Sequence, residues 1–155
     1  MTKTNVMRLL DAKGIKYEAK EYDPKKAVSA LEVASFLHES VSVVFKTLVT
    51  VSKSKEHYVF VIPADKELNL KKAAKAAEEK NIEMIPQKDL LPLTGYIHGG
   101  CSPIGQKKQF RTFVDESALL YDYFYISGGK LGTQVKISPA DLESMIGCIF
   151  VSLTD

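Results

Sequence analysis

The chain has 155 residues, a length that favours one domain with a single sizeable core and excludes two ordinary domains. Its 45% hydrophobic and 26% charged residues are typical of a soluble globular protein, and its longest apolar runs are strand-sized, which excludes a membrane-spanning helix. The net charge of +2 is too small to indicate nucleic-acid binding by itself, because such binding depends on Lys and Arg clustered on one face.

Neither the N-terminal residues nor the cysteines indicate secretion. Residues 1–12 alternate polar and apolar positions at helical spacing instead of forming a signal peptide, so we expect a cytoplasmic protein. Cys101 and Cys148 form neither a CxxC pair nor a metal-binding spacing. We therefore expect no metal, disulfide or cofactor. No repeat or linker interrupts the sequence, which predicts one domain over residues 1–155.

The first third of the chain predicts two helices and a strand. Residues 4–13 have the apolar spacing of a helix, and residues 15–22 have the composition of a strand. Ser29 and Glu32 stand at the spacing of a capping box, in which each side chain bonds the other residue's backbone N–H. We expect the helix that they open to end near Ser40.

The middle of the chain predicts a hairpin followed by a helix. Residues 45–51 and 57–62 are rich in β-formers and are separated by a short polar loop. Residues 70–80 keep Leu70 and several alanines on one helical face and place lysines outward. Residues 82–85 then read as a short strand, and residues 87–91 as a helical turn.

The last third predicts further strands over residues 111–114, 123–126 and 133–137, a helix that begins at Ser138 as its cap, and a closing strand within residues 148–153. Strands and helices neither alternate regularly nor separate into blocks. We therefore expect an α+β (mixed α/β) fold, in which a mixed sheet curls into a partly closed barrel with helices packed around it.

Two glycine-rich segments and an isolated lysine are the candidates for a ligand site. Residues 99–105 and 127–132 each combine glycines with small polar residues, and Lys46 interrupts an apolar strand. Glycine lets a ligand approach backbone N–H groups, which can receive a carboxylate, a phosphate or a developing oxyanion. A cation beside such groups could add to the stabilisation.

Each of these features also has a structural interpretation. Residues 99–105 could be only a tight turn, and Lys46 could extend from a strand edge to solvent. Lys107, Lys108 and Arg111 suit nucleic-acid phosphate, but such a run is also typical of a solvated face. Cys101 lacks the positioned base that a nucleophilic thiolate requires.

Three motifs in order resemble those of the YbaK/EbsC family of aminoacyl-tRNA deacylases, which belongs to the superfamily of YbaK and prolyl-tRNA synthetase editing domains. The motifs are FKTL at 45–48, GYIHGGCSPIGQKK at 95–108 and SGGKLG at 127–132. The resemblance covers nearly the whole chain. It implies a mixed β-barrel surrounded by helices. It also implies an enzyme that removes cysteine mischarged on tRNA(Pro), with Cys-tRNA(Cys) as a second substrate, in partnership with prolyl-tRNA synthetase.

The family resemblance also implies a mechanism and a set of site residues. The thiol of the bound cysteinyl group attacks its own ester and leaves as a cyclic thiolactone, so the protein needs to supply only orientation and oxyanion stabilisation. The implied catalytic groups are Lys46 and the backbone of Gly100 and Cys101. The implied substrate-binding residues are Tyr22, Val28, Thr47, Gly99, Ser102, Ser127, Gly128, Gly129 and Gln134, and the expected tRNA-binding residues are Lys107, Lys108, Arg111 and Lys130.

Two other functions remain open from the sequence. A deacylase for alanine or another small amino acid would use water, because alanine has no thiol. The cysteine-specific branch of the family carries an acidic residue near Gln134 and an aromatic residue near Val28, and this chain has neither. The second alternative is a non-catalytic nucleotide- or RNA-binding module that uses the same glycine bends and the same basic residues.

Overall fold

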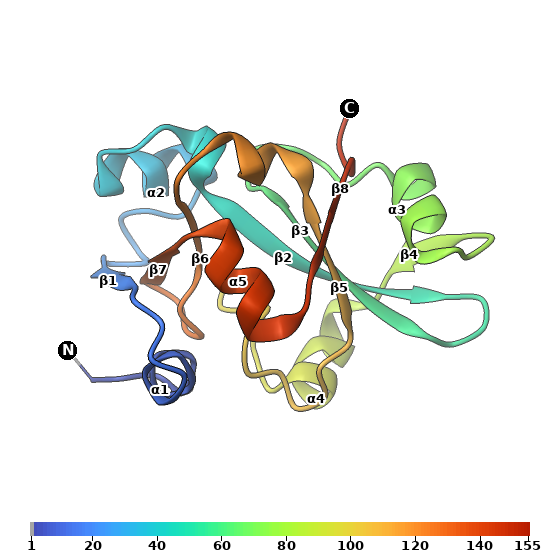
Figure 1. The fold of residues 1–155 in the computed structure, drawn as a ribbon, viewed down its shortest axis with the longest axis horizontal. Helices are drawn as coiled ribbons and strands as arrows, with labels where there is room; N and C mark the ends of the chain where they lie inside the picture. The colour runs from blue at the N-terminus through green and yellow to red at the C-terminus, as the bar shows by residue number, and fades with distance from the viewer. Residues whose placement is uncertain (1) are drawn as a thin grey trace.

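The computed structural model describes residues 2–155 and places the strands of this part of the chain in two sheets. The smaller sheet lies at the left of Figure 1 and the larger one extends to the right. The three-stranded sheet has the order β1 (Glu18–Glu21), β7 (Thr133–Ile137), β6 (Phe124–Ser127), and the five-stranded sheet has the order β4 (Ile82–Met84), β2 (Phe45–Ser52), β3 (His57–Pro63), β5 (Arg111–Asp115), β8 (Ile149–Val151).

Strand β3 is central to the larger sheet and is covered on both faces. Val59 and Val61 pack in the main hydrophobic cluster, whereas Phe60 and Ile62 pack in a second cluster on the other face. All four side chains are fully buried. A strand buried on both faces reads as a continuous apolar run in the sequence, which explains the run over residues 58–62.

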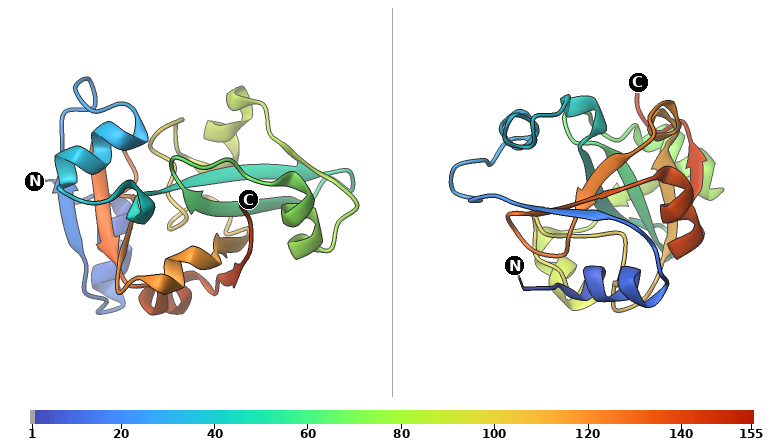
Figure 2. Two further views of the ribbon diagram at one scale, coloured as in Figure 1. Left: turned by 90° about the horizontal axis from the view of Figure 1, so that it is seen from above. Right: turned by 60° about the vertical axis from the view of Figure 1, so that its left-hand side comes forward.

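The two sheets meet where β2 begins, and they do not close into a barrel within residues 2–155. Val44, just before β2, forms a parallel bridge with Tyr125 of β6, and the rings of Phe45 and Phe124 lie edge to face with centroids 4.9 Å apart. The left panel of Figure 2 shows the smaller sheet at one end of the larger one. The mixed α/β class is confirmed, whereas one sheet curled into a barrel is replaced by two adjoining sheets.

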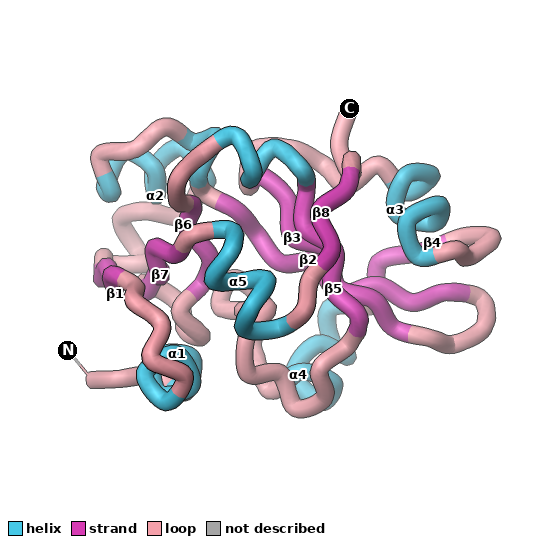
Figure 3. Tube along the Cα trace, in the orientation of Figure 1, coloured by secondary structure: helices cyan, strands magenta, loops and turns pink. Residues whose placement is uncertain are grey.

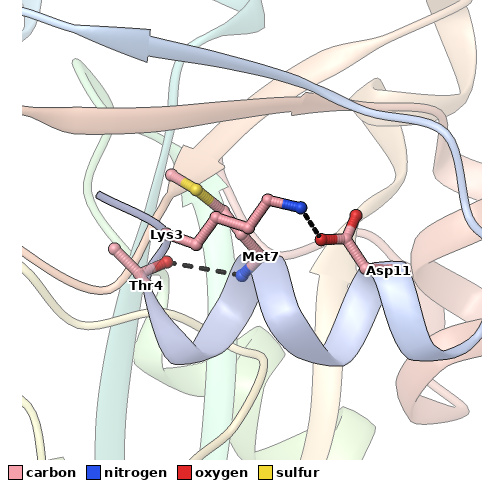
Figure 4. A network of polar contacts seen from close by, with 4 residues as sticks. All are labelled: Lys3, Thr4, Met7 and Asp11. Atoms are coloured by element: carbon pink, nitrogen blue, oxygen red, sulfur yellow. Dashed lines mark hydrogen bonds and ion pairs between the residues drawn. The ribbon is translucent and has the colours of Figure 1, made fainter. Parts of the chain in front are cut away.

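Helix α1 (Asn5–Ala12) packs through an apolar face and is tied at its N-terminus. Val6 and Leu10 are fully buried one helical turn apart. The Thr4 hydroxyl accepts a hydrogen bond from the Met7 N–H at 3.3 Å, and Lys3 forms an ion pair with Asp11 along the helix (Figure 4). A side-chain oxygen at this position satisfies a backbone donor that has no partner within the helix.

Helices α2 (Ala30–Leu37) and α3 (Leu70–Ala77) are both shorter than the sequence predicts. The capping box of Ser29 is present, with the Ser29 hydroxyl accepting from the Glu32 N–H at 3.1 Å. Each helix ends in a left-handed residue, His38 or Glu78, with φ of 58° in both cases. At the start of α3, Leu70 is 43% exposed and lies outside the apolar face that we expected it to join.

The remaining helices lie at the periphery of the sheets, as Figure 3 shows. The closing helix α5 begins after Ser138 as predicted. The predicted strand over residues 15–22 is reduced to β1, and the expected turn at 87–91 is a 3-10 turn that leads into α4.

Within residues 2–155, no helix is both long enough and apolar enough to cross a membrane. The helices are α4 (Leu90–Thr94) and α5 (Pro139–Ile146), and the 3-10 helices are Val41–Val43, Gln87–Asp89 and Glu116–Leu120.

Candidate active site

A cavity of about 260 Å³ lies at the junction of the two sheets. Its apolar walls include Val33 of α2, Ala64 after β3 and Leu90 of α4. A larger, more open groove of about 720 Å³ beside α1 contains none of the predicted site residues. The smaller cavity, by contrast, brings together eight of them: Tyr22, Val28, Lys46, Thr47, Gly99, Cys101, Ser127 and Gln134.

The two glycine-rich segments pack directly against each other at this cavity. A Cβ atom added to Gly100 would lie 3.2 Å from three backbone atoms of Lys130 and Leu131. Gly99 has a φ of +87°, and a Cβ there would lie 2.7 Å from the Leu131 Cδ2 atom. Gly100 therefore allows the close approach of two backbone segments, whereas the positive φ of Gly99 is a conformation that favours glycine.

Ser127 joins the two segments through its hydroxyl. Its Oγ donates to the Gly100 carbonyl at 2.9 Å and accepts from the Gly129 N–H at 3.1 Å. The Gly128 N–H donates to the Thr133 carbonyl at 2.8 Å, which closes the turn between β6 and β7. Gly128 and Gly129 therefore shape the turn without lining the cavity, and Ser127 fixes the position of the Gly100–Cys101 peptide.

The backbone donors of the 99–101 segment differ in availability. The Gly100 N–H donates to the Ile97 carbonyl at 3.0 Å and is therefore already paired. Within residues 2–155, the Cys101 N–H has no protein acceptor. Since an unpaired N–H beside a cavity can stabilise an oxyanion, the Cys101 N–H is the better candidate donor of the two.

The Cys101 thiol lines the cavity but is not activated. Burial raises its pKa to about 11, and an interaction with the Thr94 side chain only partly opposes that effect. The thiol is therefore protonated at neutral pH, whereas nucleophilic cysteines require the thiolate. This agrees with our expectation that Cys101 contributes its backbone to the site and not its sulfur.

Lys46 stands at the cavity on β2, paired with Ile62 in the ladder. Its side chain is half-buried, and within residues 2–155 it has no carboxylate partner. The residues that line the cavity include no Asp or Glu. A lysine without a counter-charge in a site free of carboxylates favours an anionic ligand or a polarised carbonyl.

Gln134 and Tyr22 also line the cavity. The Gln134 Nε2 donates to the Tyr22 hydroxyl at a long 3.4 Å, and the Gln134 Oε1 is buried without a partner among the described residues. Gln134 is only 8% exposed. Because a buried acceptor without a partner is costly, this amide oxygen is a candidate to receive a donor group of the ligand.

Other predicted residues lie outside the cavity lining. Ser102 is fully buried in a turn, where its Oγ accepts from the Ile104 N–H at 3.2 Å and its carbonyl accepts from Gln106 at 3.0 Å. His98, which the sequence did not single out, does line the cavity. The one signal for His98 was its position directly before Gly99.

The four predicted tRNA-binding residues lie on two loops and at the start of β5. Lys130 lies beside Gly100, and Lys107 lies over Gly95, where a Cβ atom would be 3.4 Å from the lysine Cγ. Arg111 begins β5 and pairs with Tyr58 of β3. Ile62, the partner of Lys46, lies four residues from Tyr58 along β3, which is about 13 Å at 3.3 Å per residue.

The site thus consists of a small cavity with a free lysine, an unpaired backbone donor, a buried amide acceptor and a neutral thiol. Within residues 2–155, no group of three His, Cys, Asp or Glu side chains is placed to hold a metal ion. Such a site can bind a compact polar acyl group and stabilise negative charge on its carbonyl oxygen, as the class of sites that process esters requires.

Comparisons with known proteins agree with this class. The model of the aminoacyl-tRNA editing domain family matches residues 24–145. Over 153 residues, 98% of this chain and 93% of the relative, the sequence is 42% identical to a protein of Enterococcus faecalis named "Putative Cys-tRNA(Pro)/Cys-tRNA(Cys) deacylase EbsC". The chain therefore belongs to the aminoacyl-tRNA editing domain family, and the family resemblance is confirmed.

One further sequence match and two solved structures extend the comparison. A proline–tRNA ligase of Brachyspira hyodysenteriae is 29% identical over 111 residues, which are 72% of this chain and 19% of the ligase. A crystal structure of a "putative trans-editing enzyme for prolyl tRNA synthetase" is 22% identical with a TM-score of 0.85, covering 99% of both chains. A crystal structure of a hypothetical protein has a TM-score of 0.89 at 25% identity, covering 98% of this chain and 100% of the other.

Proposed function

We propose that this protein is an aminoacyl-tRNA deacylase that removes cysteine mischarged on tRNA(Pro), and that it can also act on Cys-tRNA(Cys). The observation that carries the proposal is a cavity with groups that stabilise an oxyanion but with a protonated thiol in place of a nucleophile. An ester bound there reacts if the substrate brings its own nucleophile. Cysteine does so, whereas alanine and proline do not. The similarity to EbsC supports the same substrate.

In the proposed reaction, the cysteinyl sulfur attacks the carbonyl carbon of its own ester. The carbon–sulfur bond forms, the bond from carbon to the ribose oxygen breaks, and the thiol proton reaches the ribose oxygen through solvent. The products are a cyclic thiolactone and free tRNA. Holding sulfur and carbonyl together in one cavity makes the attack intramolecular, which can supply much of the rate.

The site residues take complementary parts in this reaction. Lys46 holds the terminal adenosine or its phosphate, and the Cys101 N–H faces the developing oxyanion. The Oε1 of Gln134 is free to accept from the substrate's ammonium group. The Tyr22 hydroxyl accepts a hydrogen bond from the Gln134 amide, and Thr47 also lines the cavity.

Size explains why a separate editing domain is useful for this substrate. A synthetic site that admits proline cannot strongly reject cysteine, because packing differences of about one methylene give only about 1–3 kcal/mol of discrimination. The cavity of about 260 Å³ is near the lower limit of roughly 300 Å³ for ligand pockets. It suits a small aminoacyl group better than a large one.

The tRNA itself is held more loosely. We assign phosphate contacts to Lys107, Lys108, Arg111 and Lys130, which are exposed on two loops and at the start of β5. A small basic patch gives little selectivity for one tRNA, so a transient complex with prolyl-tRNA synthetase in the cytoplasm would direct the enzyme to its substrate. We propose that residues 1–155 act as one domain in this role.

A comparison of aminoacyl esters tests the proposal. The purified protein is incubated with cysteinyl-, seryl- and alanyl-tRNA of the same tRNA(Pro) sequence, and release of each amino acid is followed. We expect rapid loss of cysteine only. Equal turnover of the alanyl ester would favour a water-dependent editor of small amino acids, and binding without any ester loss would favour a non-catalytic RNA-binding module.

A further inference from the structure

His98 stands at the outer end of the cavity. The deep part is formed by Cys101, Ser127 and Gln134, which are 7–8% exposed. His98 and Gly99 also line the cavity but are exposed to solvent. The cavity therefore has a buried end and an open end, and the imidazole lies at the open one.

The backbone next to His98 offers a second group to the same ligand. Within residues 2–155, the Gly99 N–H has no protein acceptor. Gly99 has a φ of +87°, in the left-handed region that favours glycine. An imidazolium beside a free N–H is a receptor for an anion, and the cavity lining has no carboxylate to compete with that anion.

The orientation of the substrate follows from the two ends of the cavity. If the aminoacyl group enters the buried end, as the proposed function requires, the ribose and the phosphates of the tRNA extend through the open end. We propose that His98, in its protonated form, binds a phosphate at the 3′ end of the tRNA together with the Gly99 N–H. The inference rests on the proposed function only for this orientation.

This role makes tRNA affinity depend on pH. Only the protonated imidazole carries the positive charge that attracts phosphate, and an imidazole loses that charge as the pH rises. Affinity for tRNA therefore falls as the pH rises. The neighbouring cations attract phosphate equally across this pH range, so they do not cause the change in tRNA affinity. The titratable residues that line the cavity with His98 are Tyr22, Lys46 and Cys101.

The test measures the Kd of uncharged tRNA(Pro), which requires no catalysis, at about pH 6 and about pH 8. Variants His98→Gln and His98→Arg are compared with the wild type. His57→Gln is the matched control, because His57 packs on Phe110 with ring centroids 5.2 Å apart and does not line the cavity. Circular dichroism confirms that each variant is folded before its Kd is used.

We expect the wild-type Kd to rise about 5-fold more between the two pH values than that of His98→Gln, as one charge-assisted contact would give. His98→Arg should bind tightly at both pH values, and His57→Gln should follow the wild type. An identical pH response in His98→Gln and wild type would overturn the inference. In deacylation assays, a loss in kcat with unchanged KM for His98→Gln would overturn it too, since that pattern indicates proton transfer. Absence of deacylation by the wild type would instead count against the proposed function alone.

Discussion

Replacement of Ser127 by alanine should destabilise the protein and separate the two glycine-rich segments. The Ser127 hydroxyl bonds the Gly100 carbonyl at 2.9 Å and the Gly129 N–H at 3.1 Å, and the side chain is 8% exposed. Gly100 is buried, so its carbonyl would lose its partner without access to water. A buried polar group left without a partner costs about 1–3 kcal/mol, and the half-buried Gly129 N–H adds roughly 1 kcal/mol. We expect a loss of about 2–4 kcal/mol in the free energy of unfolding.

The matched control for this change is Ser117→Ala. The Ser117 Oγ is also buried but has no hydrogen-bond partner within residues 2–155, so its removal should be neutral or slightly stabilising. Urea unfolding followed by circular dichroism measures both variants, and a shift in midpoint at constant m-value reports stability. If both variants lose the same stability, the hydrogen bonds of Ser127 are not the cause and the reasoning fails.

Three further variants test the site. Lys46→Ala should lower kcat/KM for deacylation about 10–100-fold, as the loss of a charged contact to the tRNA end would give. Lys75→Ala, on the exposed surface of α3, should stay near wild type, and equal values for the two variants would remove Lys46 from the site. Cys101→Ala should keep its activity, because burial raises the pKa of the thiol to about 11 and holds it protonated. The variant should lose only about 1 kcal/mol of stability, and a folded but inactive variant would show that the sulfur reacts. Reversing Lys107 and Lys108 to Glu should weaken tRNA binding and reduce the slope of log K against log salt by about 2, and an unchanged slope would place the tRNA on another surface.

Local signals in the sequence predicted the elements well. The capping box of Ser29 and the cap at Ser138 both begin helices in the structure. The ends of helices were harder to predict. His38 and Glu78 adopt the left-handed conformation that usually favours glycine, so no residue type marked the end of α2 or α3, and both helices were extended too far.

Pairing between distant strands was not readable from the sequence. The bridge between Val44 and Tyr125 joins residues that are far apart in the chain, and nothing in either strand's composition specifies that partner. Alternating polarity shows that a strand has a buried face, but it does not show which sheet provides the neighbour. The two adjoining sheets were therefore mistaken for one curled sheet.

Residue chemistry that is unusual for its position marks the candidate site in the sequence. Lys46 within an apolar strand and the glycines at 99 and 100 stood out, and the structure places them at one cavity or directly beside it. Ser102 belongs to the same motif but supports a turn. His98 was missed because an exposed loop histidine carries no pattern, and only the packing around Gly99 places it at the cavity.

The most direct test of the account uses tRNA(Pro) charged with cysteine, in parallel with the same substrate after alkylation of the cysteine thiol. Release of the amino acid is followed at equal enzyme concentration, and the product from the free thiol is identified by mass spectrometry. The account predicts rapid release as thiolactone from the free-thiol substrate and no release above background from the alkylated one. Comparable release from both substrates would contradict it, because water would then be the nucleophile and the substrate thiol would not be required.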